Sequence, residues 1–266
     1  MSSFFWRNPL QQQVVLGLFR TLYDPDKPQR ILDVGCSSGE MTLTYAMLLQ
    51  DEYGDGWHKR FPITAIDMEE NAIQRCFRGI YPGNLIYQTP RSYRNRFFDE
   101  YLGAPAAMGR VSAHGNITPL LIFKTTALQR RIDWTCQDFA DFADPGPFSL
   151  VFCQNTLIHM TDDEADRALY KLHSLLIPGG FLVCAGKHPD GYATIYELGF
   201  HPVPHNIELV YSGWIQRKQC KIERQRLKGY NPDDPLLPFK IGSLFRKDND
   251  PDFRRETLEI METSGR

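Results

Sequence analysis

From Arg30 onward, short apolar segments alternate with segments whose apolar residues recur at helical spacing. The first pair is RILDVG followed by EMTLTYAMLLQ, and the second is FPITAID followed by EENAIQRCFRGIY. Strands that alternate with helices are joined by crossover connections, which favour parallel pairing. The sequence therefore predicts an α/β fold, with a mostly parallel twisted sheet that carries helices on both faces.

Three later apolar runs, RIDWTCQDF, FSLVFCQN and GGFLVCAG, predict further strands of this sheet. Between the last two, DDEADRALYKLHSLL predicts a helix that ends before Pro178 and Gly179. Residues 84–131 break the alternation with a basic, aromatic helix candidate, PRSYRNRFFDEYL, and a Gly-punctuated stretch that predicts a small inserted hairpin subdomain. We therefore expect one main domain over residues 1–230, with this insertion, and a Pro/Asp-rich C-terminal extension over residues 231–266.

Composition narrows the possible partners of the chain. A net charge of −2 over 266 residues gives no general attraction to nucleic acid or to an anionic membrane. No apolar run approaches the roughly 20 residues that span a bilayer, and the N-terminus lacks the layout of a secretory signal. The six cysteines stand singly without a C-x-x-C pair, which argues against zinc and disulfides. We expect a cytoplasmic protein with no bound metal, and with neither nucleic acid nor membrane as a partner.

The segment DVGCSSGE is the strongest local motif. The first strand ends at Val34, glycines stand at Gly35 and Gly39, and a helix begins near Glu40. Glycine lets backbone approach a ligand closely, but the middle glycine of the G-x-G-x-x-G dinucleotide fingerprint is missing. Acidic residues, Asp33 and Glu40, lie on either side of the loop. They disfavour a pyrophosphate and favour a ligand with positive charge, such as S-adenosyl-L-methionine (SAM) with its sulfonium and ammonium groups.

Acidic residues recur at the ends of the next strands. Asp67 ends the second strand and Asp138 follows the third. Ligands of open α/β sheets bind at the carboxyl ends of strands, where Asp67 could accept ribose hydroxyls and Asp138 could meet the adenine edge. We include their neighbours Met68 and Phe139 in the candidate site. The alternative is a tight turn in which the aspartates only cap helices.

The N-terminal segment SSFFWRNP poses a separate question. Phe4, Phe5 and Trp6 are followed at once by Arg7, although chain termini are usually frayed and polar. Three consecutive aromatic residues at such a place must either bury themselves or cover something.

The chain resembles the catalytic domain of chemoreceptor glutamate methyltransferases, the CheR family, from Ser3 to about Pro189. By this resemblance, residues 1–230 would form the catalytic domain. Six family motifs recur here in order: T-x-F-F-R as Ser3–Arg7, S-T-G-E as Ser37–Glu40, G-I-Y as Gly79–Tyr81, L-T-P as Gln88–Pro90, V-D-F-x-x-x-N-L as Ile132–Trp134 with Asp138 and Phe139, and F-C-R-N-x-x-I-Y as Phe152–His159.

This resemblance implies a Rossmann-like class I methyltransferase fold, SAM as cofactor and S-adenosyl-L-homocysteine as product. It also implies that Arg7 meets the methionine carboxylate of the cofactor while the aromatics close the site as a lid. The alternative is that the segment only plugs a hydrophobic groove. The cofactor-binding residues expected are Ser3, Phe5, Arg7, Gly35, Ser37, Gly39, Glu40, Asp67, Met68, Asp138, Phe139, Gln154 and Asn155.

Departures from the family pattern concern the methyl acceptor. The family's arginine in F-C-R-N is Gln154 here, its tyrosine is His159, and its N-terminal helical domain does not precede the F-F-R element. We therefore expect a small-molecule acceptor or a non-chemoreceptor protein group. A carboxylate acceptor needs no base, whereas a hydroxyl or amine acceptor does, and His159 is the candidate base. Together with Arg7, it makes up the expected catalytic residues. Alternatively, His159 caps the helix that starts near Asp162.

Two other interpretations remain open at the level of the sequence. His188 and Tyr192 either line the acceptor pocket or are simple loop residues. The protein itself is expected to be a SAM-dependent methyltransferase acting on a carboxylate, hydroxyl or amine. The alternatives are a chemoreceptor-type protein-glutamate O-methyltransferase and a SAM-binding module without catalysis.

Overall fold

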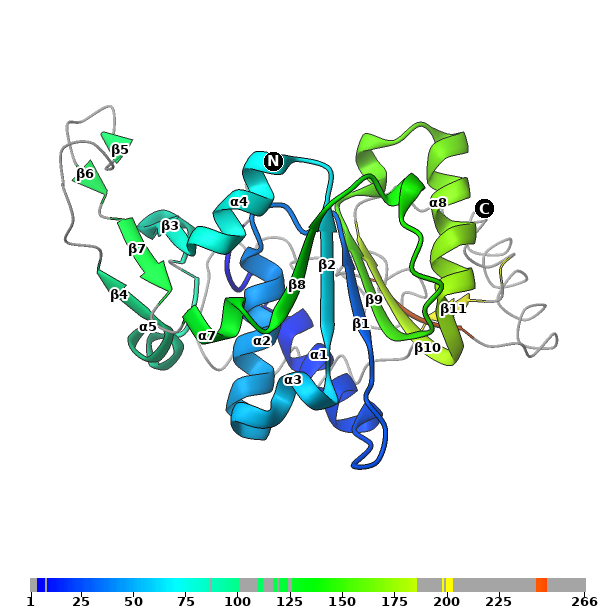
Figure 1. The fold of residues 1–266 in the computed structure, drawn as a ribbon, viewed down its shortest axis with the longest axis horizontal. Coiled ribbons are helices and arrows are strands. Elements are labelled where there is room, and N and C mark those ends of the chain that lie inside the picture. Colours follow the sequence, from blue (N-terminus) through cyan, green and yellow to red (C-terminus); the bar gives the residue numbers. More distant parts are fainter. Residues whose placement is uncertain are drawn as a thin grey trace, which may run out of the picture. The chain divides into compact units, whose positions relative to one another are not determined.

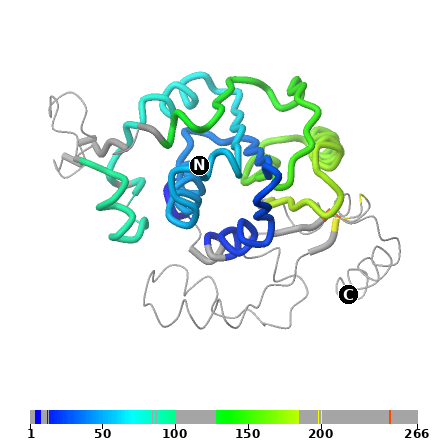
Figure 2. Tube along the Cα trace, turned by 60° about the horizontal axis from the view of Figure 1, so that its bottom comes forward, coloured from blue at the N-terminus to red at the C-terminus, as the bar shows by residue number. Residues whose placement is uncertain are grey.

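The computed structural model describes residues 4–7, 9–86, 88–100, 110–111, 117–118, 120–123, 126–185, 198, 200–202 and 243–247, and Figure 2 draws the rest in grey. The chain forms two compact units. The first consists of Met1–Gln12 and Phe19–Ala143, and the second of Gln13–Leu18 and Asp144–Arg266. Helix α1 (Pro9–Leu22) contributes residues to both.

Three parallel strands form the sheet of the first unit (Figure 1). In it, β2 (Ile63–Asp67) lies between β1 (Ile31–Val34) and β8 (Ile132–Cys136). Every residue of β1 is buried, as its continuous apolar run predicts for a strand covered on both faces. The register places Val34 opposite Ile66, and Asp67 opposite Cys136. The segments that follow all three strands therefore leave the sheet at one edge.

Helices connect these strands as the sequence predicts. After β1 the chain forms α2 (Glu40–Tyr53), then the short η1 (Gly54–Gly56) and α3 (Trp57–Arg60), before it returns as β2. After β2 it forms α4 (Glu70–Arg78), which contacts β2 and β8. Of the 14 residues of α2, nine are buried, whereas α4 buries only Ile73 and Cys76. Helix α2 is thus part of the core, and α4 lies at its edge.

The segment between α4 and β8 forms two small antiparallel sheets outside the parallel sheet. In one, β7 (Leu120–Phe123) pairs with both β3 (Ile80–Pro82) and β4 (Phe98–Glu100); in the other, β5 (Arg110–Val111) pairs with β6 (Ile117–Thr118). This confirms the prediction of a small inserted hairpin subdomain. Among the described residues, this region also contains η2 (Gly83–Leu85), α5 (Arg91–Phe97) and α7 (Thr126–Gln129).

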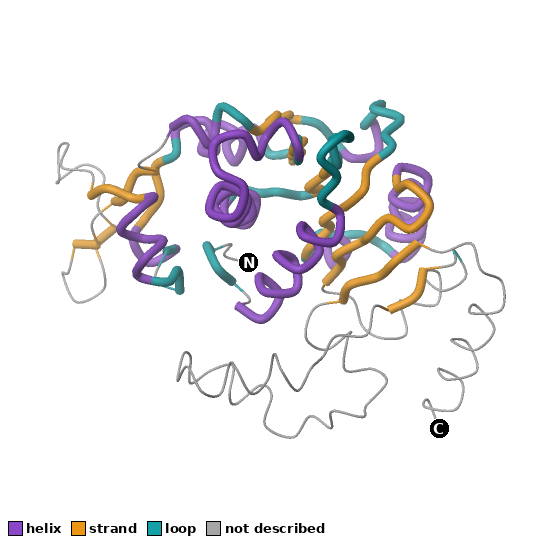
Figure 3. Tube along the Cα trace, turned by 90° about the horizontal axis from the view of Figure 1, so that it is seen from below, coloured by secondary structure: helices purple, strands orange, loops and turns teal. Residues whose placement is uncertain are grey.

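Helix α5 is shorter than PRSYRNRFFDEYL predicts. It ends at Phe97, because Phe98, Asp99 and Glu100 pair with β7 and continue as β4 (Figure 3). Arg96 of this helix forms an ion pair with Asp51 of α2 at the surface, and the Tyr93 hydroxyl donates to the same carboxylate at 2.8 Å.

In the second unit, β9 (Phe148–Gln154) and β10 (Leu176–Ala185) pair in parallel and are connected through η4 (Leu157–His159) and α8 (Asp162–Leu175). Strand β12 (Ser243–Lys247) pairs antiparallel with β10, and β11 (Phe200–Pro202) pairs antiparallel with β12. The expected helix and strands at FSLVFCQN, DDEADRALYKLHSLL and GGFLVCAG are all present, although β10 begins already at Leu176.

Strand β12 lies within the segment that the sequence assigns to a C-terminal extension. Its Lys247 is 9% exposed, and the ammonium donates to the backbone oxygens of His173 and Leu176, both at 2.9 Å. Burial lowers the pKa of Lys247. The Lys247 ammonium therefore satisfies two backbone carbonyls at the C-terminus of α8. This part of the predicted extension forms a strand that pairs with β10.

The prediction of a Rossmann-like α/β fold of mostly parallel strands with helical crossovers is confirmed. Among the described residues, no helix is both long and apolar enough to cross a membrane, and no cluster of His, Cys, Asp and Glu could hold a metal ion. The predicted domain boundary at residue 230 stays a prediction, with β12 lying beyond it.

Candidate functional site

The loop DVGCSSGE turns sharply between β1 and α2. The backbone N–H groups of Gly35 and Cys36 both donate to the Ile66 oxygen of β2, at 2.9 and 3.0 Å. The Gly39 N–H donates back to the Cys36 oxygen at 3.0 Å, which closes the turn. Gly35 and Gly39 have φ angles of 72° and 81°, a region that glycine adopts without steric cost.

Gly39 is also required by its surroundings. A Cβ at this position would lie 2.8 Å from the ring of Trp134 and 2.9 Å from the Cys76 sulfur. Ser37 adopts a φ of 53° without being glycine, which costs free energy unless neighbouring contacts hold it. Residues of β8 and α4 therefore pack tightly against the loop at Gly39 and hold its conformation.

Asp67 supplies one of the contacts that hold the loop. One carboxylate oxygen accepts the Ser37 N–H at 2.7 Å, and the other accepts the Glu69 N–H at 2.9 Å. Asp67 is half-buried and stands at the edge where β2 ends. A carboxylate offers about four lone-pair sites, so each oxygen keeps capacity for a further donor. The residue thus caps the turn and can still bind a ligand.

Glu40 begins α2 with an almost fully buried side chain, 1% exposed. Its Oε1 accepts the Ser38 hydroxyl at 2.6 Å. Its Oε2 is buried and accepts no hydrogen bond from the described residues. A buried carboxylate oxygen without a donor is costly, so this atom is suited to a cationic or N–H donor brought by a ligand.

Tyr81 holds the same loop from β3, the strand that pairs with β7. It is fully buried in β3, and its hydroxyl donates to the Ser38 backbone oxygen at 2.7 Å. Burial raises the pKa of Tyr81 well above its usual value, so the hydroxyl keeps its proton and stays a donor. The sequence places Tyr81 only in the G-I-Y motif, and nothing in the sequence signals its contact with the loop.

Asp33 lies in β1, directly before the last residue of that strand, with 5% of its surface exposed. Its carboxylate accepts the Thr42 hydroxyl at 2.6 Å. Burial raises the pKa of Asp33 to about 7, the Thr42 hydrogen bond opposes this shift, and the negative charge of Asp67 adds to it. Asp33 is therefore a structural carboxyl that changes its charge near neutral pH.

The N-terminal aromatics are packed into the first unit. The Phe5 N–H donates to the Leu85 oxygen at 2.9 Å, and its fully buried ring meets Tyr81 and Phe98 edge-on, with centroids 4.9 and 5.0 Å apart. Trp6 is 6% exposed, and its ring lies 4.5 Å from that of Tyr93. These two side chains are buried, as the groove-plug interpretation expects.

The rest of the N-terminal segment is less buried. The Trp6 N–H donates to the Thr44 hydroxyl at 3.3 Å, which ties the segment to α2. Arg7 is half-buried, with its guanidinium 5.9 Å from the ring centre of Phe4. Ser3, the remaining predicted residue here, lies outside the described residues.

The residues that follow β2 and β8 differ in exposure. Met68 directly follows Asp67 and is 68% exposed. Asp138 caps the short η3 (Phe139–Asp141) by accepting the Ala140 N–H at 2.9 Å, which agrees with the capping alternative. The Phe139 ring is buried against Phe142, with centroids 6.5 Å apart.

The second unit contains the other predicted site residues. Gln154 ends β9 and is half-buried, Asn155 follows with a φ of 55°, and His159 is exposed at the end of η4. His159 does not cap α8. Thr161 does, because its side chain and that of Glu164 form a reciprocal capping box. His188 and Tyr192 lie outside the described residues.

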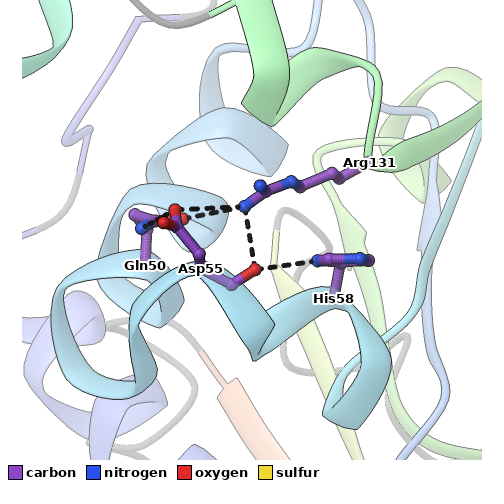
Figure 4. Close-up of polar contacts among 4 residues, drawn as sticks. All are labelled: Gln50, Asp55, His58 and Arg131. Carbon is purple, nitrogen blue, oxygen red and sulfur yellow. Dashed lines mark hydrogen bonds and ion pairs between the residues drawn. The ribbon is translucent and has the colours of Figure 1, made fainter.

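A second polar cluster lies at the other end of the parallel strands, where β8 begins (Figure 4). Arg131 donates to the Gln50 side-chain oxygen at 3.2 Å and to the Asp55 backbone oxygen at 2.9 Å, and it lies 3.5 Å from the Asp55 carboxylate. The Nδ1 of His58 meets the same Asp55 backbone oxygen at 3.1 Å. This cluster secures the turn between α2 and α3.

Comparison with known proteins identifies related sequences. Residues 1–188 match the family model described as CheR methyltransferase, SAM binding domain. The chain is 30% identical over 173 residues to a Pseudomonas putida protein that carries the name methyltransferase Cher3, across 64% of this chain and 57% of that protein. It is 26% identical over 175 residues to a chemotaxis protein methyltransferase of Vibrio anguillarum, across 65% of this chain and 58% of that protein. The matched region thus spans less than two thirds of these relatives.

Among solved structures, the chain is similar to the N-methyltransferase NodS of Bradyrhizobium japonicum in complex with S-adenosyl-L-homocysteine. The sequence identity is 14%, with 91% of this chain and 89% of that chain covered and a TM-score of 0.42. A similarity at this level says nothing about the methyl acceptor.

Proposed function

The chain belongs to the CheR methyltransferase family, and from this membership we propose that it transfers a methyl group from SAM, with the cofactor's methionine end held at the loop of residues 35–40. The observation that carries this proposal is Glu40 Oε2, which has no hydrogen-bond partner among the described residues. The side chain is 1% exposed, so it cannot rely on water to satisfy that oxygen. An ammonium group provides both the opposite charge and the N–H donor that this atom lacks.

The other residues of the first unit fit the remaining parts of the same ligand. Asp67 keeps lone pairs for the ribose hydroxyls at the end of β2. Exposed Met68 offers an apolar surface to the adenine ring. Arg7 brings a guanidinium for the methionine carboxylate. Asp138 and Phe139 would contribute through the turn they form and not through free side-chain groups, while Gln154 and Asn155 stay predictions from the sequence motif.

When bound, SAM would supply an electrophilic methyl group, whose carbon an acceptor atom would attack in line with the S–CH3 bond, so that this bond breaks and S-adenosyl-L-homocysteine leaves. The protein's part is to bind, align and desolvate the reacting groups. Glu40 and Arg7 would fix the two charged ends of the methionine portion, and Asp67 would fix the ribose. Phe5 and Trp6 would keep the adjoining backbone of Arg7 in place because their rings are buried.

For the acceptor, we propose a small molecule or a non-chemoreceptor protein group. Support comes from Gln154 and His159, which replace the arginine and tyrosine of the family motif. His159 is exposed, so its imidazole is free to approach an acceptor and take a proton from a hydroxyl or amine. The second candidate is a protein glutamate, as the resemblance to chemoreceptor glutamate methyltransferases implies, and this carboxylate acceptor needs no base.

Calorimetric titration with SAM and S-adenosyl-L-homocysteine tests the cofactor site. Glu40→Gln is expected to weaken binding by about 1.5–3 kcal/mol, since it removes the charge opposite the ammonium. Glu52→Gln is the matched control, because Glu52 lies on the same helix but pairs with Arg20 at the surface. Failure of the wild-type protein to bind either compound at millimolar concentration would refute the proposal.

Transfer from methyl-labelled SAM to a cell lysate then tests the acceptor. Mild alkali releases label from carboxyl methyl esters but not from methyl ethers or methylamines. If the label is stable, His159→Gln should lower turnover while leaving cofactor affinity unchanged. An alkali-labile label with an unaffected His159→Gln variant would favour the glutamate acceptor instead.

A further inference from the structure

Resting on this proposed cofactor site, we propose that Tyr81 is a positioning residue for the methionine end of SAM. Its hydroxyl holds the loop through Ser38, and Ser38 holds one oxygen of Glu40, so that the other oxygen faces the ligand's ammonium. Tyr81 itself touches no part of the ligand in this arrangement and acts through the two residues of the loop.

The contacts form a continuous buried chain. The Tyr81 hydroxyl donates to the Ser38 backbone oxygen at 2.7 Å, and the Ser38 hydroxyl donates to Glu40 Oε1 at 2.6 Å. Ser38 and Glu40 are 4% and 1% exposed, and Tyr81 is fully buried. In such surroundings hydrogen bonds are strong and well directed, because water does not compete for them. The chain ends at Glu40 Oε2, the atom that has no partner among the described residues.

The loop needs this support. Ser37, directly before Ser38, has a φ of 53°, which only outside contacts can maintain at low cost. Asp67 holds Ser37 from one side through its backbone N–H. Tyr81 holds Ser38 from the other side through its backbone oxygen. Together they determine how Ser38 presents its hydroxyl, and therefore how the Glu40 carboxylate is turned.

Tyr81 is itself well fixed. Its backbone lies in β3, opposite Leu121 of β7. Its ring and that of Phe5 pack in a T-shaped arrangement, with ring centroids 4.9 Å apart. Phe5 stands two residues before Arg7 in the chain. Tyr81 therefore contacts both segments that carry the proposed partners of the methionine group, the one with Glu40 and the one with Arg7.

The test compares two ligands on matched variants. Tyr81→Phe removes only the hydroxyl, and Tyr93→Phe is the control, since the Tyr93 hydroxyl bonds Asp51 and not the loop. S-adenosyl-L-homocysteine carries the amino acid portion, whereas 5′-methylthioadenosine lacks it. Because Tyr81→Phe loses one hydrogen bond that orients Glu40, its affinity for S-adenosyl-L-homocysteine should fall about 5- to 10-fold. Its affinity for 5′-methylthioadenosine should not change. Tyr93→Phe should change neither affinity.

Ser38→Ala provides an independent variant, because it removes the bond to Glu40 while leaving Tyr81 intact. It should show the same selective loss, and the double variant Ser38→Ala with Tyr81→Phe should lose less than the product of the two single effects. Equal losses for both ligands, or no loss, would overturn the positioning role. If the wild-type protein binds neither ligand, the proposed function fails instead.

Discussion

The Asp67 carboxylate caps the loop, and we propose that it also binds the ribose, although the sequence presents these two roles as alternatives. It accepts the Ser37 and Glu69 N–H groups at 2.7 and 2.9 Å, which is what a capping residue does. Each oxygen nevertheless keeps a lone pair for a further donor such as a ribose hydroxyl. A residue that shapes a loop can thus also bind the ligand for which the loop is shaped.

Asp67→Ala is expected to weaken SAM binding by about 1.5–3 kcal/mol, the range for losing hydrogen bonds to a charged group. Titration calorimetry measures this, with the free energy of unfolding measured on the same variant. Asp24→Ala is the control, because Asp24 also accepts two backbone N–H groups, at 2.8 and 3.2 Å, in the turn before β1. Unchanged affinity in a well-folded Asp67→Ala protein would show that Asp67 is only a cap.

Asp33 makes the stability of the protein depend on pH. Its pKa is raised from 3.8 to about 7 by burial. Between these pH values the folded protein retains a proton that the unfolded chain has released, so stability falls as the pH rises. Each pH unit in this window costs about 1.4 kcal/mol, and below the lower value there is no cost because both states are protonated.

Asp33→Asn is therefore expected to stabilise the protein by a few kcal/mol at pH 8 and to be neutral near pH 3.5. Chemical unfolding at both pH values measures the difference. A variant that is equally stabilised or destabilised at both would mean that the Asp33 carboxyl titrates near its usual value in the folded protein.

At the scale of the elements, the N-terminal segment combines two buried aromatic side chains with a half-buried arginine. Phe5 and Trp6 pack against Tyr81, Phe98 and Tyr93, whereas Arg7 remains half-buried. Deleting residues 1–7 would remove anchors and arginine together. Single substitutions separate the two roles.

Phe5→Ala is expected to cost about 3–5 kcal/mol of stability, because it empties a fully buried aromatic site. Arg7→Ala should leave the melting temperature close to that of the wild type and lower SAM affinity by about 1.5–3 kcal/mol. Thermal unfolding and calorimetry on both variants distinguish these effects. If Arg7→Ala binds SAM as tightly as the wild type, the segment is a groove plug and Arg7 has no part in cofactor binding.

The sequence predicts the main elements from two kinds of pattern. Strands β1, β2 and β9 are short apolar runs, and helices α2, α4 and α8 carry apolar residues at helical spacing. In contrast, Phe98–Glu100 continues the helical pattern of α5 but pairs with β7 as β4. Strand pairing with a distant segment overrides local propensity there, and no local pattern can signal it.

At the scale of the whole molecule, β12 is the main feature that the sequence does not predict. Its five residues come from a segment dense in Pro and Asp, which is typical of irregular structure. They form a strand because β10 offers an unpaired edge and because Lys247 can pair with two carbonyls at the end of α8. Both conditions exist only once the second unit is folded.

The sequence by itself determined the α/β fold, the glycine loop after β1, and the acidic residues at the ends of the strands, since these follow from periodicity and residue type. Only the tertiary structure decided what each side chain does. It paired Asp138 with its own turn and buried Phe5 and Trp6. It also left Glu40 Oε2 with no partner in the described part of the chain, while Tyr81 and Ser38 hold the loop around it. Burial and hydrogen-bond satisfaction depend on neighbours far apart in the chain, and local sequence patterns carry no record of them.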